Sequence, residues 1–79
     1  MPSWSKKFWK PIVLRDGREL ATLADARDLM LALPERHQSR PLWQYAAELL
    51  IDAAERSSRA NVDGAWAQLH RALTAEGLL

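Results

Sequence analysis

Few side chains in this sequence are of the types that carry out acid–base, nucleophilic or metal chemistry. The chain has two histidines, His37 and His70, and no cysteine. Within this chain, a thiolate nucleophile, a thiolate metal site and a disulfide framework are therefore excluded. Neither histidine has a second metal-binding residue at a spacing typical of a ligand set. We expect His37 to be solvated and His70 to lie at the border of the core.

Phosphate-binding loops are also missing. The three glycines are scattered, and each stands where a turn or a helix end is expected, so no glycine-rich cradle for a nucleotide is formed. We predict that the chain is not an enzyme and has no cofactor, no metal and no identifiable small-molecule ligand. A third functional hypothesis, beside the interaction module and the nucleic-acid binder described below, is an enzyme that pairs His70 with Glu76 or Asp63.

The segment that most resembles a binding surface is WSKKFWK, residues 4–10, in which aromatic residues alternate with lysines. Aromatic rings can stack on bases or lie at a membrane interface, while lysines pair with phosphates. In the structural interpretation, Trp9 and Phe8 instead close the core and the lysines keep a strand edge hydrated. We favour the structural interpretation, because a formal net charge of +1 is far from that of a dedicated nucleic-acid binder. If the segment binds a partner, the candidate interaction surface is Trp4, Lys6, Lys7, Phe8, Trp9 and Lys10.

A β-hairpin is predicted from residues 8–14 and 19–23, joined at Asp16-Gly17. A two-residue loop would set Arg15 opposite Arg18, which is a destabilising pair of like charges. A three-residue loop over 15–17 with a left-handed Gly17 avoids that pair and places Ile12 opposite Leu20 and Leu14 opposite Arg18, so we favour it. The register decides whether Ile12, Leu14 and Leu20 or Trp9, Val13 and Ala21 face the helices, because a slip of one residue exchanges the two sides of a strand.

Three helices should follow the hairpin. Thr22 and Asp25 match a capping box, so the first helix begins there, and Pro34 ends it. Residues 35–40 are expected to form a polar connection, after which a second and most buried helix begins at Pro41. Its expected apolar stripe is Leu42, Tyr45, Ala46, Leu49 and Ala53, widened by Trp43, Ala47, Leu50 and Ala54.

The third helix is expected to begin after Asn61 as N-cap and to end at Gly77, with Leu78 packed back on its last turn. The chain has 79 residues, of which 48% are hydrophobic. These values predict one small α+β domain, a two-stranded antiparallel hairpin packed on three helices (ββααα). We expect residues 1–7 to be a loosely ordered N-terminal tail and residues 8–79 to form the domain. No apolar run approaches the roughly 20 residues that span a bilayer, so we expect a cytoplasmic protein without membrane contact.

A set of residues spread along the chain follows the pattern of a small bacterial protein family: Trp9, Pro11, Gly17, Thr22, Asp25-Ala26, Leu33-Pro34 and residues 65–75. In this pattern the chain resembles domain-of-unknown-function family 982, a group of short proteins frequent in rhizobia and related bacteria. The resemblance covers residues 8–78 and implies the fold, but no activity and no site residues. The sequence departs from the family pattern at Leu33, where the family has Trp, and in a longer, more charged connection at 35–40.

These observations favour a non-enzymatic interaction or regulatory module that binds an unidentified protein partner or itself. A two-stranded sheet leaves two edges for another chain, so we expect self-association through the hairpin edge, with a homodimer as one form. The alternative is weak nucleic-acid binding through the N-terminal Trp/Lys segment, although nucleic acid is not the partner that the net charge favours.

Overall fold

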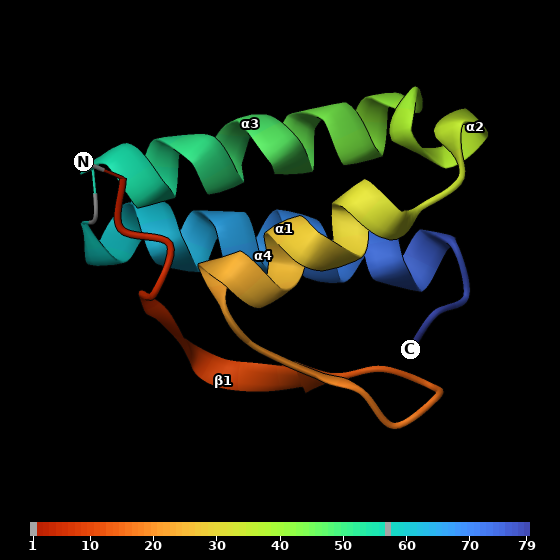
Figure 1. Cartoon of the computed structure of the whole chain (residues 1–79), viewed down its shortest axis with the longest axis horizontal. Helices are drawn as coiled ribbons and strands as arrows, with labels where there is room; N and C mark the ends of the chain where they lie inside the picture. The colour runs from red at the N-terminus through yellow and green to blue at the C-terminus, as the bar shows by residue number, and fades with distance from the viewer. Residues whose placement is uncertain (1, 57) are drawn as a thin grey trace.

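The computed structural model describes residues 2–56 and 58–79, which form a hairpin followed by helices (Figure 1). This order confirms the predicted α+β fold, with one addition. The connection predicted over residues 35–40 contains a single helical turn, so the described residues form four helices. The elements are β1 (Lys7–Val13), β2 (Glu19–Thr22), α1 (Leu23–Ala32), α2 (Glu35–Gln38), α3 (Pro41–Arg56) and α4 (Arg59–Ala75).

The helices α3 and α4 run side by side along the long axis of the molecule, and their contact is the most extensive in the fold (Figure 1). The helix α1 packs on α3, while the hairpin crosses below with β1 next to α4 and β2 next to α1. The core lies between these layers. Its largest fully buried side chains are Leu23, Trp43, Leu50, Leu69 and Leu73.

The register of the hairpin confirms the three-residue loop. Ile12 pairs with Leu20, and the Leu14 amide donates to the Arg18 carbonyl at 2.7 Å. Gly17 has a φ of +94°, the left-handed conformation that glycine adopts without strain. Phe8 and Ile12 of β1 therefore face the helices, whereas Val13 remains exposed. Within the turn, the Arg18 backbone amide donates to Asp16, which holds the pKa of that carboxyl below its ordinary value.

The strand β1 is irregular in its middle. Lys7 pairs with Thr22 and Ile12 with Leu20, so the pairing shifts between these two positions. Pro11 lies inside the shift, where its missing amide hydrogen removes no regular ladder bond. The Lys10 carbonyl there accepts a hydrogen bond of 2.9 Å from the Trp66 indole of α4. The irregularity thus fastens β1 to a helix.

The predicted capping box is present at the start of α1. The Thr22 hydroxyl accepts from the Asp25 amide, and the Asp25 carboxylate accepts from the Thr22 amide in return. The same carboxylate also accepts from the Ala21 amide at 2.9 Å. One side chain therefore joins the last residues of β2 to the first turn of α1.

Replacement of Asp25 by alanine is expected to destabilise the fold by about 1–2 kcal/mol, because two backbone amides lose their acceptor at a helix start. Urea unfolding followed by circular dichroism would measure the change. Asp28→Ala is the matched control, since Asp28 is exposed and its ion pair with Arg27, at 3.4 Å, involves no backbone amide. Equal effects of the two replacements would contradict the role of Asp25.

The buried face of α3 differs from the predicted stripe. Leu42 and Tyr45 of the predicted stripe are exposed, so their burial was wrongly predicted, whereas Ala46 and Ala53 are buried as expected. The helix lies between α1 and α4, so the face that turns inward is the one whose small side chains allow close approach. The buried residues of α3 are Trp43, Ala46, Leu50, Ala53 and Ala54.

The start of α4 also differs from the prediction. Asn61 is not the N-cap, because the helix begins at Arg59 with Ser58 as its cap. The Ser58 hydroxyl accepts from the Asn61 amide at 3.1 Å, and the Ser58 carbonyl accepts from the Val62 amide. The predicted end is confirmed: Gly77 has a φ of +71°, and the amide of the partly buried Leu78 donates to the Leu73 carbonyl.

Residues 3–6, inside the segment predicted as a tail, make backbone hydrogen bonds with the domain. The Ser3 amide donates to the Ala54 carbonyl at 2.6 Å, and the Trp4 carbonyl accepts from the Ala24 amide at 2.8 Å. Met1 lies outside the described residues. None of the helices in the described ranges is long and apolar enough to cross a membrane.

Candidate functional site

The fold divides the candidate interaction surface of residues 4–10 among three environments. Phe8 is buried and belongs to the core, so it is not available to a partner. The prediction that Phe8 belongs to the interaction surface is therefore wrong. Side chains along a strand point to alternate faces, and that of Phe8 points to the helices. Trp4 packs against the core from the other side, and its ring lies 4.9 Å from the Arg27 guanidinium.

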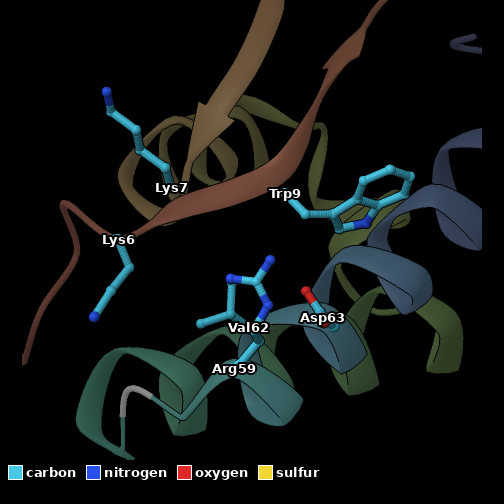
Figure 2. Close-up of a pocket in the computed structure, with 6 residues that line it drawn as sticks. All are labelled: Lys6, Lys7, Trp9, Arg59, Val62 and Asp63. Atoms are coloured by element: carbon cyan, nitrogen blue, oxygen red, sulfur yellow. The ribbon is translucent and has the colours of Figure 1, made fainter.

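Three of the remaining candidates line one pocket. Lys6, Lys7 and Trp9 lie on the β1 side of a cavity of about 180 Å³. Residues from the first turns of α4 form the opposite wall: Arg59, Val62 and Asp63. Figure 2 shows Arg59 reaching toward β1 with Asp63 beside it, while the two lysines point away from each other at the far side. Lys10 is exposed next along the strand.

Trp9 is 57% exposed, so the interpretation in which it closes the core is wrong. Its ring lies 5.2 Å from the Trp66 ring, and the Trp66 ring stacks on His70 at 5.1 Å. His70 therefore lies on the exposed face of α4 as the end of an aromatic row, rather than at the border of the core. The row consists of Trp9, Trp66 and His70.

The pocket is lined by cationic side chains that form no ion pair with any other described residue. Among the described residues, the ion pairs are Asp16 with Arg18, Arg27 with Asp28, and Glu76 with Arg40, and Glu76 also lies 3.5 Å from His37 Nε2. None of them involves Lys6, Lys7 or Arg59. Asp63 is the acidic residue of the lining, so three cations face one carboxylate.

Sequence reasoning missed a charged cluster at the other end of α4. Glu76 has a side chain that is only 10% exposed, and its two oxygens lie 2.9 Å from Arg40 and 3.5 Å from His37 Nε2. His37 is thus half-buried, which corrects the expectation that it is solvated. Its Nδ1 is buried without a partner among the described residues. Arg40 and Glu76 are 36 positions apart, so no local pattern points to this contact.

A groove between α1 and α3 was also not predicted. Two adjoining pockets of about 150 and 360 Å³ share Met30, Leu31 and Ala47. Leu31 is 71% exposed, although it is a large apolar residue. The first pocket is closed by Trp4, Arg27, Leu50 and Ile51, and the second by Gln38, Trp43, Gln44 and Glu48. The sequence signal was the position of Leu31 outside the apolar face of its helix.

Within the described ranges, no three His, Asp or Glu side chains gather as a metal site would require. Comparisons of the chain with protein-family models, with curated proteins and with solved structures gave no match. The resemblance to domain-of-unknown-function family 982 therefore stays a prediction.

Proposed function

We propose that the protein is a non-enzymatic interaction module and that it pairs with a second copy of itself through the groove between α1 and α3. The observation that carries this proposal is Leu31, which stands 71% exposed beside a groove walled by Met30 and Ala47. A large apolar side chain next to an apolar groove is typical of a protein-binding surface.

The charges that line the two pockets of the groove favour a second copy as the occupant. Arg27 lines the first pocket and Glu48 lines the second. In a two-fold contact, each residue of one copy meets the counterpart residue of the other in both directions. An antiparallel arrangement would therefore place Arg27 of each copy near Glu48 of the other, with Leu31 near the axis.

The hairpin edges are less suited to self-association than the sequence suggested. On β2, the Ala21 amide already donates to the Asp25 carboxylate, so another strand would meet a negative charge there. On β1, Pro11 has no amide hydrogen to offer. Carboxylates and prolines at sheet edges disfavour strand addition. We therefore propose the groove, rather than the hairpin edge, as the contact surface.

Leu31→Glu is expected to weaken self-association by roughly 100-fold, because the interface would then have to bury a charge. Sedimentation equilibrium over a range of protein concentrations would measure the dissociation constant. Val13→Glu is the matched control, since Val13 is apolar and 57% exposed but lies on β1 outside the groove. A strict monomer at all concentrations would refute the proposal, and an equal effect of Val13→Glu would move the interface to the hairpin.

A charge exchange tests the two-fold arrangement itself. Arg27→Glu and Glu48→Arg should each weaken the dimer, because each places like charges opposite one another. The double variant should restore much of the wild-type affinity. No recovery in the double variant would contradict the antiparallel arrangement.

A further inference from the structure

We infer that the pocket between β1 and the start of α4, lined by Lys6, Lys7, Trp9, Arg59, Val62 and Asp63, binds a nucleotide unit, that is, a phosphate carried next to a flat base. The unit could be a free nucleotide or part of a single strand, since both present the same chemistry.

The cations of the pocket provide the phosphate contact. Arg59 lies at the first position of α4, and its guanidinium reaches across the opening toward β1 (Figure 2). Guanidinium groups bind phosphate through two parallel hydrogen bonds. Lys6 and Lys7 stand on the facing side and form no ion pair among the described residues. Figure 2 shows their side chains on the β1 side of the opening, pointing away from each other, so they add positive potential to that side of the pocket.

Trp9 provides a platform for the base. Trp9 is 57% exposed, and its ring contacts the Trp66 ring at a centroid distance of 5.2 Å with the two planes tilted by 53°. Trp66 is fixed in turn, because its indole donates to the Lys10 carbonyl at 2.9 Å. A ring held in this way loses little freedom when a base stacks on it.

Asp63 selects among anionic ligands. Its carboxylate accepts hydrogen bonds and repels a second anion at the same place. A nucleotide suits it, because ribose hydroxyls and base amino groups are donors that lie close to the phosphate. An acidic peptide presents carboxylates and would be repelled. The lining therefore favours a nucleotide over an acidic protein segment.

This inference is independent of the proposed self-association. The pocket shares no lining residue with the groove between α1 and α3. A monomer could therefore bind the nucleotide, and a dimer could fail to do so.

The test is a titration at low salt with four probes: adenosine monophosphate, a single-stranded oligoadenylate, inorganic phosphate and polyglutamate. Tryptophan fluorescence and calorimetry would follow binding. We expect the two adenine-bearing probes to bind at least roughly tenfold more tightly than phosphate or polyglutamate. Equal affinity for all anions, or no binding of any probe, would overturn the inference.

Variants locate the site. Trp9→Ala and Arg59→Ala should each weaken binding of adenosine monophosphate by roughly tenfold, since they remove the stack and the phosphate contact. Arg36→Ala is the matched control, because Arg36 is exposed on α2, at the opposite end of the molecule from the start of α4 (Figure 1). A loss at Arg36 as large as that at Arg59 would overturn the inference. Thermal unfolding would verify that each variant is folded.

Asp63→Asn gives a readout that a merely structural role would not produce. Phosphate should then bind more tightly, while the preference for adenosine monophosphate over phosphate should fall. An unchanged preference would overturn the role of Asp63. The slope of the logarithm of the binding constant against the logarithm of the salt concentration separates the two ligands. A slope that corresponds to one phosphate contact would identify the free nucleotide as the ligand. A steeper slope with oligoadenylate would identify a single strand.

Discussion

Ile12→Asp is expected to destabilise the domain by about 4 kcal/mol or more, whereas Val13→Asp should change stability by less than about 0.5 kcal/mol. The two residues are neighbours in β1, but Ile12 is 3% exposed and Val13 is 57% exposed. An aspartate at position 12 would be buried against the helices without a partner. Because a domain of this size has a stability of only about 5 kcal/mol, the Ile12 variant should be largely unfolded at room temperature.

Urea titration of both variants, followed by circular dichroism, measures the difference. Ile12→Ala serves as a milder control that leaves no buried charge and should lose about 2–5 kcal/mol. The opposite order, with Val13→Asp the more damaging change, would mean that the strand is turned over and that the hairpin register is wrong.

Trp43→Ala is expected to lower the free energy of unfolding by about 3–5 kcal/mol, because the loss of a large ring leaves a cavity in the core. Trp43 is 1% exposed and is the largest of the fully buried side chains. Its indole nitrogen is buried and has no acceptor among the described residues. The loss of a hydrogen bond therefore adds nothing to the expected effect, which comes from packing alone.

Two further variants separate packing from polarity. Trp43→Phe keeps a ring and removes the unpaired indole N–H, so it should lose much less stability than Trp43→Ala. Trp9→Ala removes an exposed ring and should lose little. If Trp43→Phe and Trp43→Ala lower the free energy of unfolding equally, the indole N–H makes a stabilising hydrogen bond, and the expectation that packing alone decides the effect is contradicted.

The hairpin could be predicted because local physics decides it. A two-residue loop would oppose Arg15 and Arg18, and a longer loop with Gly17 removes that repulsion. The first helix was predictable for the same reason, since Thr22 and Asp25 form a capping box within four residues. Interactions over so short a distance can be read from the chain itself.

The phase of α3 could not be predicted in the same way. Apolar residues occur nearly all around this helix, so the pattern allows several buried faces. Which one turns inward depends on α1 and α4, which come from other parts of the chain. The chosen face contains Ala46, Ala53 and Ala54, which let α4 approach closely. The contact of Glu76 with His37 and Arg40 depends on the tertiary fold in the same manner.

The candidate site was only half predictable. Lys6, Lys7 and Trp9 stood out because aromatic and basic residues alternate in one short segment. Arg59 and Asp63 did not stand out, because they belong to an ordinary helix start far along the chain. Only the packing of β1 against α4 places the two groups around one pocket. Leu31 was not predicted as a contact residue, because a single exposed leucine outside the apolar face of a helix is common in proteins.

The attachment of the hairpin to the last helix constrains the order in which the protein can fold. Synthesis produces the hairpin first, yet the Lys10 carbonyl accepts a hydrogen bond from Trp66, and the Arg15 amide donates one to the Leu78 carbonyl. Contacts between such distant segments close late, since they require most of the chain to be ordered. The nascent hairpin must therefore wait, with its apolar face uncovered, until almost the whole domain has left the ribosome.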